Sequence, residues 1–325
     1  MELRPLGRSG LQVSRLALGT MTWGRDTDEH EARDQFAAFV EQGGTFLDTA
    51  DVYADGLSEQ IVGQLVAEVP RDSVVVATKA VSRAGSARRF DASRGHLLRA
   101  LDASLARLGL DYVDVWQLHA WDSLTPLEET LAALDAAVAS GKVRYAGISN
   151  YSGWQTAKAA ALQSAKGAGS ALVSTQVEYS LLQRGIEREV VPAALDAGLG
   201  LLPWSPLGRG VLTGKYRYGT PADSRGASAH FAAFVSPYLD SQARSIVDSV
   251  CTAAEGLGVA PLEVAIAWVR DRPGVVAPII GARTAAQLRG ALTVEGLVLP
   301  DEIAAALDEV SAPSRSYPDH GWNQR

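Results

Sequence analysis

Residues Thr45–Tyr53 read TFLDTADVY, and this stretch decides how the rest of the chain is interpreted. It starts as a short apolar strand after two glycines and turns polar at Asp48. Asp48 and Tyr53 therefore stand at and just beyond the carboxyl end of a strand. Barrels and open α/β sheets build their active sites at this end of their strands. The stretch predicts an active site whose other residues come from neighbouring strand ends.

Strands and helices alternate on both sides of this stretch. The predicted strands are Arg15–Gly19, Thr45–Asp48, Ser73–Thr78, Tyr112–Leu118, Val143–Ile148, Leu172–Val177, Leu199–Pro203 and Val275–Ile280. Helical apolar spacing is found in the segments Asp28–Gln42, Gly153–Gln163, Glu187–Ala197, Pro261–Arg270, Ala285–Leu292 and Asp301–Val310, after Ser93, and between Pro126 and Gly141. The pattern predicts an α/β fold, a (β/α)8 TIM barrel, that forms one domain over residues 1–325. A β-hairpin is expected before it, over Leu3–Ser14.

Composition narrows the function classes. Hydrophobic residues make up 47% of the 325 residues, which is enough for a large core, and the net charge of -7 argues against nucleic-acid binding. The single cysteine, Cys251, excludes an internal disulfide, and no metal-ligand spacing is found. The first residues lack the apolar run of a signal peptide, and no apolar run is long enough to span a membrane, so we expect a cytoplasmic protein without a membrane partner.

Two segments are expected near the mouth of the barrel. The longest insertion, Ser205–Asp240, follows the seventh strand and is interpreted as an active-site cover. The polar tail Ser311–Arg325 either folds over the mouth or frays. Trp23 and Trp121 lie on mouth loops and are expected, with Tyr53 and His119, to form the substrate pocket.

Three neighbouring strand ends supply four residues that form a constellation for proton transfer: Asp48, Tyr53, Lys79 and His119. A buried lysine cation beside a phenol should lower the pKa of the phenol and make it a better proton donor. Asp48 would keep Lys79 charged, and His119 would orient a substrate oxygen. Such a site fits the reduction of a carbonyl compound, in which carbon receives a hydride and oxygen receives a proton.

None of these side chains holds a hydride, so a cofactor is required. The hydroxyl and amide groups of Ser149, Asn150 and Gln176 could hydrogen-bond a carboxamide, and Trp204 offers a flat face for a nicotinamide ring. Gly281 and Arg283 begin the helix after the last strand, where phosphate binds readily, and an arginine fork suits a 2′-phosphate.

At this point the sequence resembles the aldo-keto reductase superfamily over essentially its whole length, in particular the bacterial, potassium-channel-β-like branch, because strand seven ends in Trp-Ser-Pro-Leu. The matching motifs are LALGTMTWG (Leu16–Gly24), GGTFLDTADVYADGLSE (Gly43–Glu59), ATK (Ala77–Lys79), DYVDVWQLHAWD (Asp111–Asp122), GKVRYAGISN (Gly141–Asn150), STQVEYSLL (Ser174–Leu182), PWSPLGRGVLTGKY (Pro203–Tyr216) and PIIGARTAAQL (Pro278–Leu288).

The resemblance implies NADPH-dependent reduction of an aldehyde or ketone, with Tyr53 as general acid, Lys79 and Asp48 as the pair that tunes it, and His119 as substrate orienter. The implied cofactor contacts are Gly19, Thr20, Met21, Asp48, Ser149, Asn150, Gln176, Trp204, Ser205, Leu207, Gly208, Lys215, Gly281, Arg283 and Gln287. The family often places an acid and an asparagine where this chain has Gly290 and Ala291, so we expect fewer adenine contacts and a less strict choice of NADP over NAD.

Two other functions are compatible with the barrel. Lys79 could form a Schiff base, as in an aldolase, although that requires a neutral amine and Asp48 favours the charged one. The channel-β branch shows that the scaffold can serve as a nucleotide-sensing subunit, and here all four residues of the constellation are present. The physiological substrate, the direction of the reaction and the oligomeric state are not readable from the sequence.

Overall fold

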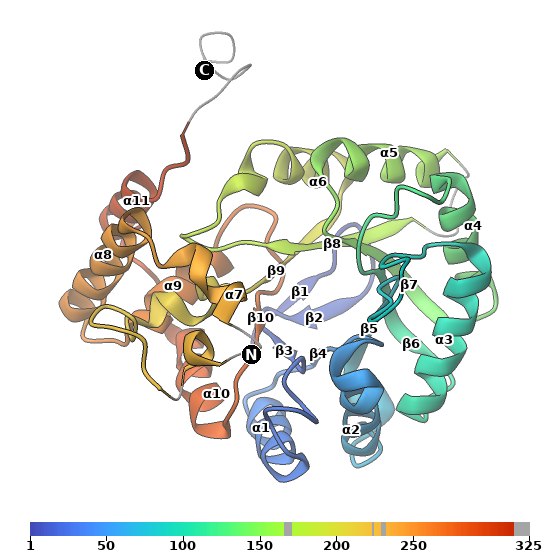
Figure 1. Ribbon diagram of the computed structural model, residues 1–325, viewed down its shortest axis with the longest axis horizontal. Helices are drawn as coiled ribbons and strands as arrows, with labels where there is room; N and C mark the ends of the chain where they lie inside the picture. Colours follow the sequence, from blue (N-terminus) through green and yellow to red (C-terminus); the bar gives the residue numbers. More distant parts are fainter. Residues whose placement is uncertain (166–170, 223, 229–231, 315–325) are drawn as a thin grey trace, which may run out of the picture.

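The computed structural model describes residues 1–165, 171–222, 224–228 and 232–314. Its centre is a ring of eight parallel strands surrounded by helices (Figure 1). Along the chain the strands are β3 (Ala17–Gly19), β4 (Phe46–Asp48), β5 (Val75–Ala80), β6 (Val113–Leu118), β7 (Val143–Ser149), β8 (Leu172–Glu178), β9 (Gly200–Trp204) and β10 (Ile279–Ile280). Each strand pairs with the next in sequence, and β10 pairs with β3. The predicted (β/α)8 barrel is confirmed.

The ring is closed between its last two strands by a short stretch before β10. Leu201 forms a parallel bridge with Val275. The Leu201 amide donates to the Gly274 carbonyl at 2.9 Å, and the Val276 amide donates to the Leu201 carbonyl at 2.9 Å. Only two residues of the predicted last strand are regular, but the bridge joins both edges of the sheet.

Helices cover the outer face of the ring. They are α1 (Glu29–Glu41), α2 (Leu57–Val66), α3 (Arg94–Leu108), α4 (Leu127–Ala139), α5 (Gly153–Ser164), α6 (Val190–Ala197), α7 (Ala232–Val235), α8 (Ser241–Leu257), α9 (Pro261–Arg270), α10 (Ala285–Leu292) and α11 (Asp301–Val310). Three of them, α2, α7 and α8, were not among the predicted helices. The two longer ones bury an apolar stripe, for example Ile61, Val62 and Leu65 in α2. Within the described residues no single helix could span a membrane, and only the combined pair α8 and α9, bent by 102°, meets the length and composition required.

The predicted hairpin is present and packs on the barrel. Strands β1 (Leu3–Pro5) and β2 (Gln12–Ser14) are antiparallel. Leu6 and Val13 are fully buried with the side chains that fill the barrel interior, such as Phe46 and Val115. The amide of Arg8 donates to the Gly198 carbonyl at 2.8 Å, just before β9 begins. The hairpin therefore lies at the amino ends of the strands and leaves the carboxyl ends open for a site.

The long insertion after β9 folds back toward the barrel mouth, as its length predicted. Its described part contains a 3-10 helix at Gly208–Thr213 and the short helix α7. Four of its residues, 223 and 229–231, lie outside the described part, as does the tail from residue 315 that we expected over the mouth.

Candidate active site

The site is built on a buried ion pair between two adjacent strands. Asp48 is the last residue of β4, and Lys79 lies inside β5, one residue before its end. The Lys79 Nζ is 2.6 Å from Asp48 Oδ2, and both side chains are almost completely buried. The other oxygen of Asp48 accepts from the amide nitrogens of Gln176 at 2.8 Å and Gln117 at 3.3 Å. The carboxylate is therefore fixed by three neighbouring side chains.

Lys79 directs the hydroxyl of Tyr53. An ammonium group has three N–H donors, and here they reach Asp48 Oδ2 at 2.6 Å, the Thr49 carbonyl at 2.8 Å and the Tyr53 hydroxyl at 3.2 Å. Because the Tyr53 oxygen accepts from Lys79, its own proton must point to another acceptor. The hydroxyl is thus a donor aimed away from the lysine.

The pKa values of this pair follow from burial and charge. Burial acts to lower the pKa of Lys79, but the charges and hydrogen bonds of Asp48 and Tyr53 together outweigh it, so the pKa lies above its usual value. Burial raises the pKa of Tyr53, and the Lys79 charge offsets only part of that rise. Lys79 favours the phenolate, as expected, but the pKa of Tyr53 is not lowered overall, because the expectation neglected the cost of burying a phenolate. Tyr53 keeps its proton at neutral pH.

His119 lies beside this phenol. The two rings meet edge to face, with centroids 6.0 Å apart. Burial, and then the Lys79 charge, lower the pKa of His119 to about 3, so the imidazole is neutral at neutral pH. Its Nδ1 is buried and has no hydrogen-bond partner among the described residues. A neutral ring with an unsatisfied nitrogen can hydrogen-bond a substrate oxygen.

A left-handed turn holds Tyr53 in place, and the sequence reading had not anticipated it. Ala54, Asp55 and Gly56 all have positive φ, at 47°, 53° and 90°. A Cβ at Gly56 would come within 2.6 Å of Arg107 Cδ, so the turn packs directly on that arginine. Arg107 is itself bound by the fully buried Glu59 at 2.6 Å. The only sign of this turn in the sequence is Gly56, which follows two residues with short side chains, Ala54 and Asp55.

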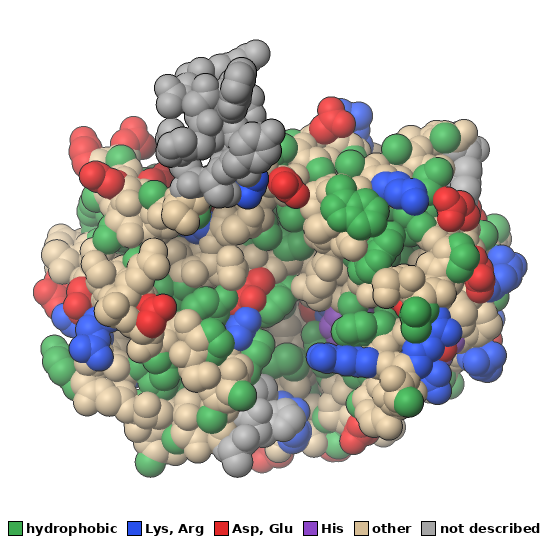
Figure 2. Space-filling model, turned by 45° about the horizontal axis from the view of Figure 1, so that its top comes forward, with side chains coloured by type: hydrophobic (Ala, Val, Ile, Leu, Met, Phe, Trp, Pro, Cys, Tyr) green, Lys and Arg blue, Asp and Glu red, His purple; other side chains and the backbone are tan. Residues whose placement is uncertain are grey.

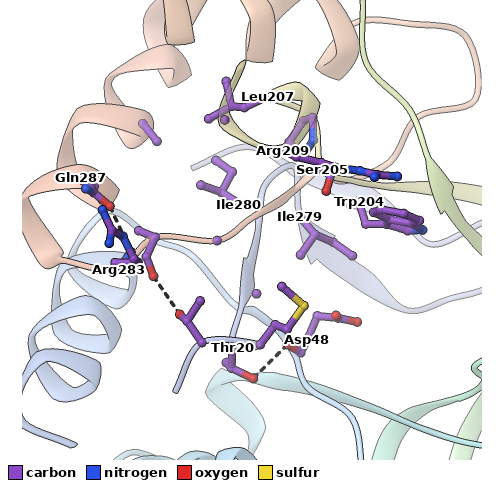
Figure 3. A pocket seen from close by; sticks show the side chains of 18 of the residues that line it. Thr20, Asp48, Trp204, Ser205, Leu207, Arg209, Ile279, Ile280, Arg283 and Gln287 are labelled. Carbon is purple, nitrogen blue, oxygen red and sulfur yellow. Dashed lines mark hydrogen bonds between the residues drawn. The ribbon is translucent and has the colours of Figure 1, made fainter. Parts of the chain in front are cut away.

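A cavity of about 580 Å³ opens over these groups and continues along the last strands. Figure 3 shows it from close by, and Figure 2 shows a hollow on this face with a histidine and hydrophobic side chains beside it. The predicted cofactor residues that line it are Gly19, Thr20, Met21, Asp48, Ser149, Asn150, Gln176, Trp204, Ser205, Leu207, Lys215, Gly281, Arg283 and Gln287. Gly208 is the exception. It is buried, and a Cβ there would meet Leu182 Cδ1 at 2.7 Å.

Two of the predicted amide contacts are already used within the protein. Asn150 donates to the His119 carbonyl at 2.9 Å and accepts from the Trp204 indole at 3.0 Å. The Gln176 amide nitrogen is bound to Asp48. In contrast, the Ser149 hydroxyl is buried, lines the cavity and has no partner among the described residues. Ser149 is the group of this set that is best placed to bind a polar ligand.

The far end of the cavity lies at the start of α10. Thr284 caps this helix by accepting from the Gln287 amide at 3.2 Å. The Gln287 side-chain oxygen accepts from the Arg283 amide at 3.0 Å, one of the bonds drawn in Figure 3. Gly290 and Ala291 also line this end, and a Cβ at Gly290 would meet nothing within 4 Å. This end of the cavity is therefore lined by the Arg283 side chain and has room beside Gly290, and the Glu31 carboxylate lies next to it on the Ala285 amide.

The insertion, which was interpreted from the sequence as an active-site cover, brings aromatic and charged side chains to the cavity. Phe234 stacks on Trp204, with ring centroids 6.4 Å apart and an interplanar angle of 16°. Arg209 lies 3.9 Å from the centroid of the Phe234 ring and binds both oxygens of Glu178 at 2.8 Å. These contacts tie the insertion to the carboxyl end of β8.

The two predicted pocket tryptophans need correction. Trp23 is completely buried, and its indole donates to the Gln35 side chain at 3.1 Å, so it belongs to the core and not to a pocket wall. Trp121 does not line the cavity but contacts Tyr151 and Trp154 beside it. Their position on mouth loops was predicted correctly, but the direction of each side chain depends on packing that the sequence does not reveal.

The donors around the cavity fit a nicotinamide dinucleotide. The flat face of Trp204 and the unpartnered Ser149 hydroxyl lie near the ion pair, and Arg283, Lys215 and the start of α10 lie toward the other end. An aromatic face and a hydroxyl at one end, with cations at the other, suit a ring at one end of a ligand and phosphates at the other. Among the described residues no group of three or more metal-binding side chains is found.

The fold and this site define a barrel enzyme with a buried lysine, an aspartate and a tyrosine at the carboxyl ends of its strands. The sequence matches the family model described as the Aldo/keto reductase family over residues 15–312. The chain belongs to this family.

Similar proteins cover the chain almost completely. The "Uncharacterized oxidoreductase YrpG" of Bacillus subtilis is 38% identical over 99% of this chain and 100% of its own length. A "Probable voltage-gated potassium channel subunit beta" of Oryza sativa is 36% identical over 98% of both chains. The "Versiconal hemiacetal acetate reductase" of Aspergillus parasiticus is 33% identical over 98% of this chain and 99% of its own. The family and these relatives support an oxidoreductase that reduces carbonyl compounds.

Proposed function

We propose that the protein reduces an aldehyde or ketone to an alcohol with NADPH, and that Tyr53 is the general acid. The observation that supports this best is the Lys79 ammonium, which is paired with Asp48 at 2.6 Å and bonded to the Tyr53 hydroxyl at 3.2 Å at the floor of the cavity. This arrangement leaves one proton on the phenol, directed toward the substrate.

The roles of the residues follow from their geometry. NADPH supplies the hydride that the protein lacks. Tyr53 donates its proton to the carbonyl oxygen as negative charge develops there, and the Lys79 cation stabilises the phenolate that remains. The neutral His119 ring binds the same oxygen and so orients the carbonyl. The cover formed by Phe234 and Arg209 excludes water from this end of the cavity.

The choice of NADPH over NADH rests on the cavity end near α10. Arg283 lines this end, and an arginine binds a phosphate through two parallel hydrogen bonds. Gly290 and Ala291 offer no polar side chain to the adenine, and the Glu31 carboxylate accepts from the Ala285 amide at the start of α10. The proposed preference for the phosphorylated cofactor therefore rests on Arg283.

The alternatives receive less support. A Schiff base needs a neutral amine, and the pKa of Lys79 is raised by the Asp48 charge. A role as a channel subunit, as in the names of some relatives, does not require a proton donor, whereas here a phenol, an ammonium and a carboxylate are connected by hydrogen bonds.

The proposed role of Tyr53 can be tested by removing its hydroxyl group. Tyr53→Phe should reduce kcat for carbonyl reduction about 10²- to 10⁴-fold, because it removes the proton donor. The control is Tyr145→Phe, which removes the same group from β7 four residues before its carboxyl end. Tight NADPH binding should persist in both variants. Unchanged turnover of Tyr53→Phe on every carbonyl that the wild type reduces would rule out this role.

A further inference from the structure

The turn that carries Tyr53 is tied to the barrel on one side and strained on the other. Before Tyr53, the Asp51 amide donates to the Lys79 carbonyl of β5 at 3.1 Å. After Tyr53, the backbone passes through Ala54 and Asp55, whose φ angles of 47° and 53° are unfavourable for residues with a Cβ. Such a conformation persists only where the surrounding structure holds it, so the second half of the turn needs a support outside the sheet.

Arg107 of α3 supplies this support. A Cβ at Gly56 would lie 2.6 Å from Arg107 Cδ and 2.8 Å from its Nε, so the turn rests directly on this side chain. The guanidinium is itself fixed, because Nε donates to Glu59 Oε2 at 2.6 Å and Nη2 donates to the Ser104 hydroxyl at 3.2 Å. These bonds hold a long side chain in one position beneath the turn.

Glu59 of α2 connects the support to the strand that carries Lys79. Its side chain is completely buried, and its other oxygen, Oε1, accepts from the Thr78 hydroxyl at 2.6 Å. Thr78 directly precedes Lys79 in β5. One carboxylate therefore binds β5 through one oxygen and Arg107 through the other, at the place where α2 and α3 lie side by side (Figure 1).

We propose that Glu59 and Arg107 are positioning residues for the general acid, and that through them β5 sets the distance between Lys79 and the Tyr53 hydroxyl. The inference rests on the proposed reductase function and adds to it two residues from the packing between α2, α3 and β5. The 3.2 Å hydrogen bond from Lys79 to Tyr53 joins a rigid strand to a strained turn. Loss of the pair should slow proton donation and leave substrate and cofactor binding in place.

Arg107→Met tests this role, because it removes the guanidinium that Glu59 holds. It should lower kcat about 10- to 100-fold, the cost of a small displacement of a catalytic group, and leave KM and the Kd for NADPH nearly unchanged. The ratio of kcat in water to kcat in heavy water should rise, because proton donation becomes slower. Arg107→Lys, which returns a cation to Glu59, should recover most of kcat. Arg107→Met combined with Glu59→Gln leaves no unpaired buried charge and should show the same loss in a stably folded protein.

Arg71→Met is the matched control. Arg71 pairs with Asp114 at the same 2.6 Å, and its side chain is 23% exposed against 26% for Arg107. Arg71 precedes β5, so it lies at the amino ends of the strands and away from the active site. The control should lower Tm to a similar degree and leave kcat unchanged. An equal loss of kcat in both variants would overturn the inference, because it would reflect a general weakening of the fold.

A double-variant cycle tests whether the pair acts through Tyr53. In the Tyr53→Phe background, adding Arg107→Met should not lower the residual kcat further, since the hydroxyl that the pair positions is already absent. A merely structural role predicts that the two losses multiply, and that result would overturn the inference.

A measurement without turnover separates this inference from the reductase function. In protein isotope-labelled at the Cζ atoms of tyrosine, the magnetic resonance signal that Tyr53→Phe removes belongs to Tyr53. Arg107→Met should shift this signal and Arg71→Met should not, because the signal depends on the hydrogen bond from Lys79. If the wild type reduced no carbonyl compound, the reductase proposal would fail, while this signal would still decide whether the pair positions the phenol. An unshifted signal in Arg107→Met would overturn the inference.

Discussion

Replacing Lys79 by methionine should test how much the buried ion pair of the active site contributes to the stability of the fold. The substitution removes an ammonium that is completely buried and leaves the Asp48 carboxylate, 3% exposed, with only two amide donors. Breaking one partner of a buried ion pair costs about 3–5 kcal/mol, because an uncompensated charge stays inside. For 325 residues the unfolding entropy is about 0.7 kcal/mol/K, so the expected fall in Tm is about 4–7 °C.

Two further variants make the measurement specific. Adding Asp48→Asn to Lys79→Met removes both charges and should recover most of the lost Tm, since a neutral pair of similar volume is often tolerated. Lys142→Met breaks an ion pair of the same 2.6 Å length with Asp102, but one whose side chains are 45% and 60% exposed. It should change Tm by less than about 1.5 °C.

The assay is differential scanning calorimetry at neutral pH of the wild type, the single variants Lys79→Met, Asp48→Asn and Lys142→Met, and the double variant. The reasoning fails if Lys79→Met and Lys142→Met lower Tm equally, which would mean that burial does not govern the pair. It also fails if the double variant loses the sum of the two single effects, since the two charges would then be independent.

Three other outcomes are expected. The kcat/KM for reduction should show no step from an imidazole near pH 6.5, because the pKa of His119 is about 3; His119→Gln should lower the rate without changing the shape of the profile, and a step near pH 6.5 lost in that variant would contradict this. Arg283→Ala should raise the Kd for NADPH about tenfold and leave that for NADH nearly unchanged, and equal losses would mean that the arginine does not bind the 2′-phosphate. Gly63→Ala should lower Tm, because its Cβ would lie 2.1 Å from a backbone carbonyl of α3, whereas Gly256→Ala, with nothing within 4 Å, should raise it slightly; a stable Gly63→Ala would show that the two helices can separate at little cost.

The order of strands and their polar ends could be predicted because each depends on local sequence. A short apolar run followed by Asp48 predicts a strand end wherever the chain folds, and eight such ends in a parallel barrel must meet at one mouth. The helices α2 and α8 were not predicted, although each has an apolar stripe. The segment before α2 was interpreted only as an active-site loop, and the segment before α8 only as part of the long insertion. Attention to the spacing of Ile246, Val250 and Cys251 would have identified α8.

How deeply each side chain is buried, and which way it points, could not be predicted from the local sequence in the same way. Trp23 was expected on a pocket wall but is completely buried, because a position on a mouth loop does not reveal which way the side chain points. The pKa of Tyr53 depends on how much water the folded chain removes from the phenol, and that is a property of the complete structure. Similarly, the internal hydrogen bonds of Asn150 require three strand ends to be placed first.

The lysine at the centre has two separate effects on the tyrosine. Its charge stabilises a phenolate, but burial outweighs this and keeps the phenol protonated before a carbonyl arrives. Its geometry matters independently, because Asp48 and the Thr49 carbonyl take two of its N–H groups and leave the third for the Tyr53 oxygen. That third bond occupies the phenol as an acceptor and forces its proton outward. The same ion pair therefore determines both that a proton is present and where it points, which is what donation to a developing alkoxide requires.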